Sequence, residues 1–139
     1  MKGFKKILIA VNGSNNVLRD GLKLAGDEGC WVTVIKVIPP YEGDINLVGI
    51  KNIGEVLNSG GAKSIKEIND IAKADGYLIK TRLEEGCIHE KILEVAEDER
   101  CDIIVMGRHA KKGIRKYFGN GILTKVMKNA HCPVLVVDA

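Results

Sequence analysis

A chain of 139 residues that is 45% apolar and 28% charged has the length and composition of one soluble globular domain, which we expect to cover residues 1–139. No apolar run is long enough to span a bilayer, and the short apolar stretch near the start lacks the cleavage pattern of a signal peptide, so we expect neither membrane insertion nor secretion and interpret this stretch as a first strand. The net charge of +3 says little by itself. The four cysteines are scattered without a CxxC pair, so we expect reduced, mostly buried thiols and a cytoplasmic location.

The first half of the chain predicts a strand, a helix and a second strand. Lys6–Val11 and Trp31–Ile38 are continuous apolar runs, which are typical of strands buried on both faces. The helix between them follows Ser14, a suitable N-cap residue. Its apolar positions recur at helical spacing: Leu18, Leu22 and Ala25. The Gly- and Pro-containing stretch Pro39–Gly61 then interrupts the pattern, and we expect a long connection there.

The second half continues the alternation. Apolar stripes at helical spacing predict three more helices, marked by Ile65, Ile68 and Ala72, by Ile88, Ile92 and Val95, and by Leu123, Val126, Met127 and Ala130. Three apolar segments predict the remaining strands: Tyr77–Leu83, Asp102–Gly107 and Pro133–Val137. Strands that are apolar throughout and alternate with helices indicate an α/β fold, in which helices cover both faces of a parallel sheet.

The stretch MGRHAKKGIRKYFGNG, Met106–Gly121, follows the fourth predicted strand and contains four glycines, five basic residues and no acid. Seven basic and no acidic residues lie between positions 103 and 137, which leaves the rest of the chain with a net charge of −4. Ligands of open parallel sheets bind beyond the carboxyl ends of the strands, and glycines before a helix N-terminus suit an anion. A solvated basic turn explains the same pattern, and the charge alone leaves both interpretations open.

Four segments in order give the chain a resemblance to a known family. The segment ILIAVNGS resembles the first strand of the universal stress protein family, and KVIPP resembles the close of the second strand. The segment EEGCIHEKILEVAEDERCDIIVMG resembles the third-helix and fourth-strand region, and HCPVLVV resembles the final strand. The resemblance implies a Rossmann-like sheet of five parallel strands in the order 3-2-1-4-5. It also implies an ATP site and a homodimer formed through the last strand.

The chain departs from the family's nucleotide-binding motif, which is Gly-x-x-Gly, nine residues, then Gly followed by Ser or Thr. Gly107 matches the first glycine, but Ala110 stands at the second, and Asn120 and Gly121 stand where Gly and Ser are expected. Asn12 replaces the Asp of the family, which removes a charge that strengthens hydrogen bonds. If position 110 needs a left-handed backbone, alanine costs about 1–2 kcal/mol there. We therefore expect ATP or a related nucleotide to bind weakly.

The nucleotide-binding residues that the resemblance implies are Val11, Asn12, Val37, Met106, Gly107, Arg108, His109, Ala110, Gly119, Asn120, Gly121, Ile122 and Leu123. Val37 lies at the end of the second strand and is implied to lie near an adenine, with Met106 and Ile122 close by, although core packing is the better explanation of each of these apolar side chains taken alone. Arg108 and His109 are suited to a phosphate, or to a solvated loop.

No motif predicts catalysis or a protein-bound metal. The chain has no nucleophile elbow and no P-loop, and its cysteines and histidines lack zinc-site spacing, so we expect no enzyme beyond slow ATP hydrolysis. Six aromatic residues and no recognition motif argue against nucleic acid. Two functions remain: a nucleotide-binding stress-response regulator with an unknown protein partner, or a dimeric protein-interaction module of the same fold whose basic face meets an acidic partner.

Overall fold

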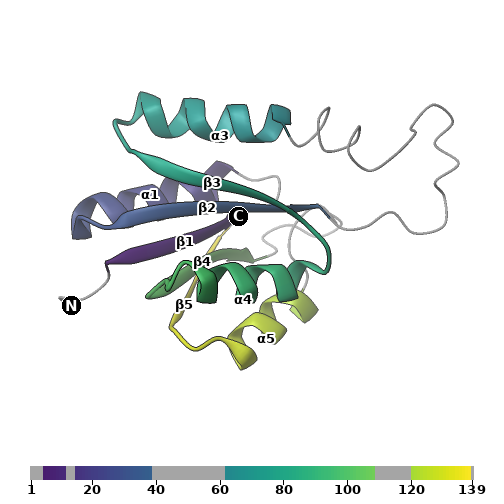
Figure 1. Ribbon diagram of the computed structural model, residues 1–139. Coiled ribbons are helices and arrows are strands. Elements are labelled where there is room, and N and C mark those ends of the chain that lie inside the picture. Colours follow the sequence, from purple (N-terminus) through teal and green to yellow (C-terminus); the bar gives the residue numbers. More distant parts are fainter. Residues whose placement is uncertain (1–4, 12–14, 39–61, 109–119, 139) are drawn as a thin grey trace, which may run out of the picture.

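The computed structural model describes residues 5–11, 15–38, 62–108 and 120–138. Its sheet (Figure 1) has five strands: β1 (Lys6–Val11), β2 (Trp31–Ile38), β3 (Ile79–Glu85), β4 (Ile103–Arg108) and β5 (Val134–Asp138). The strand order is β3-β2-β1-β4-β5, and each neighbouring pair is parallel. The predicted fold, a Rossmann-like parallel sheet in the order 3-2-1-4-5, is therefore confirmed.

Helices cover both faces of this sheet. The described helices are α1 (Asn15–Glu28), α3 (Ala62–Ala74), α4 (Ile88–Asp98) and α5 (Asn120–Asn129). Two of them, α1 and α3, lie on one face, and α4 and α5 lie on the other (Figure 1). None of the described helices is long and apolar enough to cross a bilayer. The predicted N-cap Ser14 and the predicted connection 39–61 lie outside the described residues.

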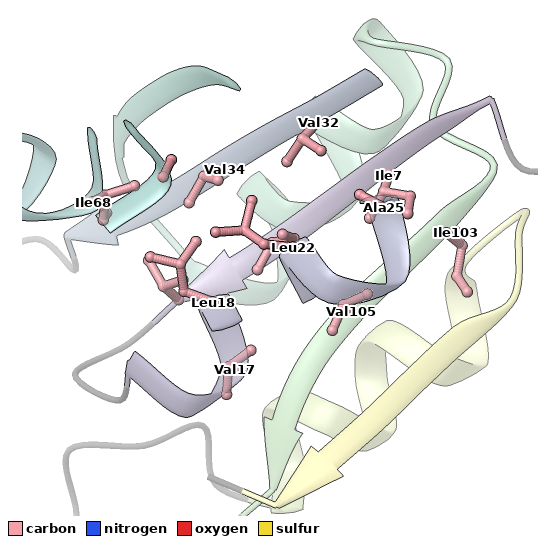
Figure 2. Packing of buried hydrophobic residues seen from close by; sticks show 13 residues of the cluster. Ile7, Val17, Leu18, Leu22, Ala25, Val32, Val34, Ile68, Ile103 and Val105 are labelled. Atoms are coloured by element: carbon pink, nitrogen blue, oxygen red, sulfur yellow. The ribbon is translucent and has the colours of Figure 1, made fainter. Parts of the chain in front are cut away.

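The alternation of side chains along β1 produces two hydrophobic cores. Ile7 and Ile9 face the α1 and α3 side, and Leu8 and Ala10 face the α4 and α5 side, all at most 1% exposed. Figure 2 shows the first core, in which the predicted helix stripe meets residues of the neighbouring strands. The members of that stripe are all buried: Leu18, Leu22 and Ala25. A strand that is apolar at every position is thus explained by burial on both faces.

One residue of the predicted helix stripes is not part of the core. Met127 is 55% exposed, whereas its neighbour Val126 is fully buried against the sheet. Consecutive helix positions differ by about 100° around the axis, so α5 cannot direct both side chains at the same strand. Met127 thus marks the predicted helix without belonging to its buried face.

The third strand is shifted by two residues from its predicted range, Tyr77–Leu83. The N–H of Tyr77 donates to the carbonyl of Ala72 at 2.8 Å, which closes the end of α3 before the strand begins. Leu78 is 91% exposed. Pairing with β2 starts only at Ile79, and it continues to Glu85 because β2 itself extends that far.

The fourth and fifth strands each begin and end one residue later than predicted, relative to Asp102–Gly107 and Pro133–Val137. Asp102 instead connects the starts of two strands. Its carboxylate accepts hydrogen bonds from the backbone N–H groups of Lys5 at 2.7 Å and Lys6 at 3.0 Å. A polar residue next to an apolar run thus marks the boundary of the strand rather than its first position.

Candidate functional site

The strand order places a switch point between β1 and β4, because the chain leaves β1 toward β2 on one side and leaves β4 toward β5 on the other. The pairing of these two strands ends at Ile9 and Val105. Each strand nevertheless continues, β1 to Val11 and β4 to Arg108. The two strands therefore separate at their carboxyl ends, which is where open sheets of this kind bind ligands.

Two helices begin at this edge of the sheet. The described part of α1 starts at Asn15, four residues after the end of β1, and α5 starts at Asn120. Neither helix has an acidic residue in its first turn over the described positions. The first backbone N–H groups of a helix carry a partial positive charge, so both helix ends attract an anion. Gly121 is exposed, and among the described residues outside its own helical turn no atom lies within 4 Å of a Cβ placed there.

Arg108, a predicted phosphate ligand, forms an ion pair across the sheet. Its Nε lies 2.6 Å from Oδ1 of Asp138, the residue opposite it in β5. Both side chains are well exposed, at 62% and 69%. Exposed pairs of this kind contribute about 0–1 kcal/mol, so the pair reduces the positive charge at the site without fixing Arg108 firmly.

The predicted adenine neighbours lie together on the α4 and α5 side of the sheet. Val37 is 5% exposed and Met106 is fully buried, and both belong to the core between the sheet and these helices. Ile122 and Leu123, at the start of α5, are half-buried and pack against the same core. Val11 is 6% exposed and lies in the core of the opposite face. Core packing accounts for all five side chains, and their contact with a nucleotide stays a prediction.

The remaining predicted site residues are only partly described. Gly107 is buried in β4, opposite Val137 of β5. Asn120 is the first residue of α5. The others lie outside the described residues: Asn12, His109, Ala110 and Gly119. The described residues thus include the strand ends and helix starts that border the site.

Lys36 is a positive residue at this edge that the sequence analysis did not single out. It lies near the end of β2, paired in register with Val11 of β1, and it is half-buried. Burial lowers the pKa of its ammonium group below the ordinary lysine value, because the charged form loses hydration. The sequence feature that could have identified it is a lysine within a mostly apolar strand, WVTVIKVI.

Two hollows in the described surface lie at the opposite edge, where the strands begin. One, of about 250 Å³, is lined by Leu93, Ile104, Cys101 and Cys132, among others. The second, of about 500 Å³, lies beside the exposed Trp31. Neither hollow coincides with the switch point, and some of the residues next to the switch point in the sequence lie outside the described ranges.

The cysteines are less buried than predicted. Cys30, Cys101 and Cys132 are half-buried, and Cys87 is exposed because it precedes the first turn of α4 outside the core. Burial, followed by the neighbouring Cys132, raises the pKa of the Cys101 thiol to about 11. Burial also raises the pKa of Cys132. Thiols that stay protonated at neutral pH are poor nucleophiles, so the first hollow contains no activated sulfur.

The fold is that of a Rossmann-like α/β protein whose sheet has its switch point between β1 and β4. More specifically, the chain belongs to the universal stress protein family, whose family model matches residues 3–138. Universal stress protein MJ0531 of Methanocaldococcus jannaschii is 33% identical over 144 residues, which cover 96% of this chain and 82% of that protein.

Solved structures agree with this assignment. The structure of MJ0577, a universal stress protein of the same organism, superposes with a TM-score of 0.74 at 28% identity, covering 98% of this chain and 96% of that one. A universal stress protein of Archaeoglobus fulgidus in complex with dAMP has a TM-score of 0.66 at 18% identity, covering 99% and 100%. A further universal stress protein structure, in complex with cAMP, has a TM-score of 0.68 at 18% identity, covering 96% of this chain and 96% of that one. At such identities these two complexes show the shared fold.

Proposed function

We propose that this chain is a stress-response regulator that binds ATP or a related adenine nucleotide weakly at the switch point between β1 and β4. The observation that carries the proposal is the separation of these strands at their carboxyl ends, next to two helix N-termini without acids in their first turns. Structural neighbours in complex with dAMP and cAMP support an adenine nucleotide as the ligand. Regulation of an unknown protein partner by the bound nucleotide is part of the proposal.

Weak binding is expected from the residues that differ from the family's motif. Ala110 replaces a glycine, Asn12 replaces an aspartate, and Gly121 replaces a hydroxyl-bearing residue. The ion pair with Asp138 also reduces the charge that Arg108 offers to a phosphate. Asn12, Gly121 and the ion pair of Arg108 each weaken one hydrogen bond or charge contact, and Ala110 adds backbone strain if position 110 needs a left-handed conformation.

Restoring the motif should tighten binding. The double variant Ala110→Gly, Gly121→Ser is expected to gain about 1 kcal/mol in ATP affinity, roughly fivefold, from relief of backbone strain and one added hydroxyl hydrogen bond. Among the described residues, no atom beyond the local helix lies within 4 Å of a Cβ at Gly121, which leaves room for the serine on that side. Calorimetric titration of both proteins with ATP, ADP, AMP and cAMP, at two salt concentrations, measures this gain and its electrostatic part.

The titration also separates this function from its alternative. If the parent chain gives no heat at millimolar ATP while the double variant binds, the natural site has lost its nucleotide. That result would favour the dimeric protein-interaction module. If neither protein binds, the switch-point edge is not a nucleotide site in this chain.

We further propose a cytoplasmic location, as the cysteine pattern predicts. In the described part of the chain, which includes all four cysteines, none is in a disulfide. Free thiols persist in reducing compartments. Cell fractionation with an antibody against the chain tests this location, and recovery in a secreted or membrane fraction would contradict it.

A further inference from the structure

Three potential metal ligands lie together at the start of α4. The ligand atoms of Cys87, His89 and Glu90 all lie within 4.8 Å of one another. Sγ of Cys87 is 3.2 Å from Nδ1 of His89. In the described part of the chain this is the one group of three such residues that comes so close. The residues are nearly consecutive, and no part of the proposed nucleotide site includes them.

The turn between β3 and α4 fixes the direction of these side chains. Gly86 has φ +145°, a backbone conformation that favours glycine, and its N–H donates to the carbonyl of Ile38 at 3.0 Å. Cys87 follows with an extended backbone, and its carbonyl accepts the first helical hydrogen bond, from Lys91 N–H at 2.9 Å. Ile88 packs against the α4 and α5 core.

Because Ile88 packs against this core, the side chains next to it at the start of α4 are directed toward solvent. Cys87 and Glu90 are exposed, and His89 is half-buried. The Cys87 side chain makes no hydrogen bond to the first N–H groups of α4, so its sulfur is not occupied in capping the helix. The three donors are thus on an accessible surface, and the partly buried Ile88 between Cys87 and His89 anchors the start of the helix.

The donor set selects the kind of ion. Thiolate, imidazole and carboxylate are the three side-chain ligands of Zn²⁺, whereas Ca²⁺ and Mg²⁺ take oxygen ligands. Bonds of about 2.0–2.3 Å to one tetrahedral ion place ligand atoms about 3.3–3.8 Å apart, so small side-chain movements would complete the geometry. A thiolate and a carboxylate together carry two negative charges and so neutralise the +2 charge of the ion. The positive N-terminal end of α4 therefore does not repel the occupied site.

The other cysteines do not offer the same chemistry. Cys101 and Cys132 are half-buried, and burial raises the pKa of both thiols, which opposes loss of the proton that a metal must displace. His131 is adjacent to Cys132 in the sequence, yet no group of three ligands forms around them among the described residues. This pair therefore serves as a natural comparison for the cluster at α4.

We propose that Cys87, His89 and Glu90 bind one Zn²⁺ ion. The ion displaces the thiol proton of Cys87 to solvent, and three protein ligands leave a fourth position for water or an external donor. The site lies at the carboxyl end of β3, beside the end of β2, and thus on the same edge of the sheet as the switch point. It shares no residue with the nucleotide site and does not depend on nucleotide binding.

Cobalt substitution of the full chain tests the site. Co²⁺ bound by a thiolate gives a charge-transfer absorption band in the near ultraviolet, and we expect this band to appear at one equivalent and to vanish when Zn²⁺ is added. Competition with a chromophoric chelator then measures Zn²⁺ affinity. Cys87→Ser, His89→Ala and Glu90→Gln should each weaken it about tenfold or more, whereas Cys132→Ser and His131→Ala should leave it unchanged.

Either of two results would overturn the proposal. One is no charge-transfer band in the parent chain, and the other is a band that survives Cys87→Ser. A band lost in Cys132→Ser instead would place the metal at the opposite edge of the sheet. Circular dichroism confirms folding of each variant, and Glu90→Gln keeps the size of an exposed side chain, so its weaker binding cannot be attributed to unfolding.

Discussion

At the scale of single residues, Gly21 determines how closely α1 approaches the sheet. A Cβ at this position would stand 2.6 Å from Cδ1 of Ile9, which is fully buried in the centre of β1. Overpacking in Gly21→Ala should cost about 1–3 kcal/mol. The gain of about 1 kcal/mol that alanine brings to a helix interior offsets part of this cost, so the free energy of unfolding should fall by up to about 2 kcal/mol. Urea unfolding measures the difference.

A second glycine of α1 provides the control. A Cβ at Gly26 would also come within 2.6 Å of another atom, but that atom is the hydroxyl of Tyr77, at the far end of a half-buried side chain. The ring of Tyr77 must move aside, which costs little at the end of a half-buried side chain, so Gly26→Ala should cost less than Gly21→Ala. Equal losses in the two variants would contradict the close contact between α1 and Ile9.

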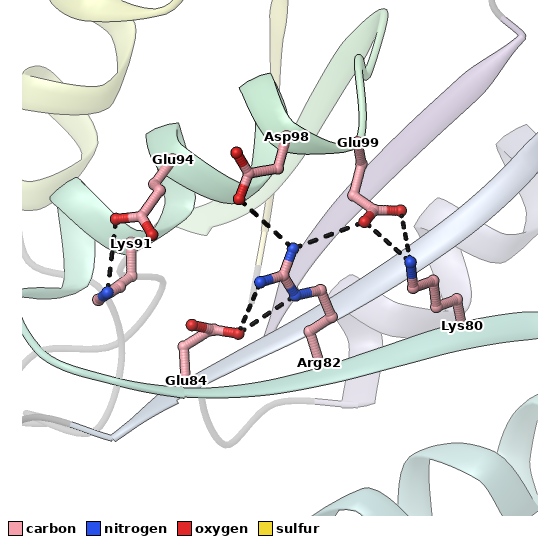
Figure 3. A network of polar contacts seen from close by, with 7 residues as sticks. All are labelled: Lys80, Arg82, Glu84, Lys91, Glu94, Asp98 and Glu99. Carbon is pink, nitrogen blue, oxygen red and sulfur yellow. Dashed lines mark hydrogen bonds and ion pairs between the residues drawn. The ribbon is translucent and has the colours of Figure 1, made fainter.

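At the scale of elements, a charged network connects the edge strand β3 to the end of α4 (Figure 3). Arg82 lies 3.0 Å from Glu84 and 3.5 Å from Glu99, and Lys80 lies 2.9 Å from Glu99. The hydrogen bond from Lys80 is the main cause that lowers the pKa of Glu99 in the folded protein. Charged residues along β3 also protect this edge from pairing with other chains.

This network predicts a loss of stability in acid. Because the pKa of Glu99 is lower in the folded state, its contribution to stability is present above the unfolded carboxyl pKa and is lost as the pH falls below about 4.3. Glu99→Gln should therefore destabilise the protein at pH 7 more than at pH 3. Urea midpoints at both pH values test this, with the exposed Glu67→Gln as the control. An equal effect of Glu99→Gln at both values would contradict the assigned pairing.

Most elements could be predicted because apolar periodicity reports burial directly. The range of β1 was predicted without error, since every residue from Ile7 to Val11 is buried. The ends of β3 could not be, because they depend on which residues of β2 are available for pairing. Hydrophobic pattern thus determines that an element exists, and contacts with other segments determine where it stops.

The candidate site was less predictable than the fold for a similar reason. The resemblance predicts a set of site residues, but it does not include the partner of Arg108, which is thirty positions away in the sequence, at Asp138. The cluster at the start of α4 is local in sequence, yet it depends on the turn at Gly86, which spacing rules for cysteine and histidine do not include. Both features depend on the folded backbone, which determines the residues that lie next to one another.

At the scale of the whole molecule, the two sheet edges differ in chemistry. Unlike β3, the edge strand β5 reads VLVVD, and Leu135 is 38% exposed. An apolar edge strand favours pairing with another chain, and we propose that β5 pairs with its equivalent across a two-fold axis. Leu135→Lys should shift the protein toward the mass of one chain in light scattering across micromolar concentrations.

A matched substitution at the other edge controls for added charge. Leu78→Lys introduces the same residue at a position that is 91% exposed beside β3, and it should leave the mass unchanged. A parent chain with the mass of one chain at every concentration would exclude the dimer. A dimer lost equally in both variants would show that β5 is not the specific interface.

Amide chemical shifts during an ATP titration test whether an adenine nucleotide binds where β1 and β4 separate. We expect saturable shifts of the amides of Gly107 and Arg108, at the carboxyl end of β4, and of Gly121, at the start of α5. We expect unchanged amides at Cys101 and Cys132, which line the hollow of about 250 Å³ at the opposite edge. Shifts confined to that hollow, or no shifts at millimolar ATP, would contradict the proposed nucleotide site.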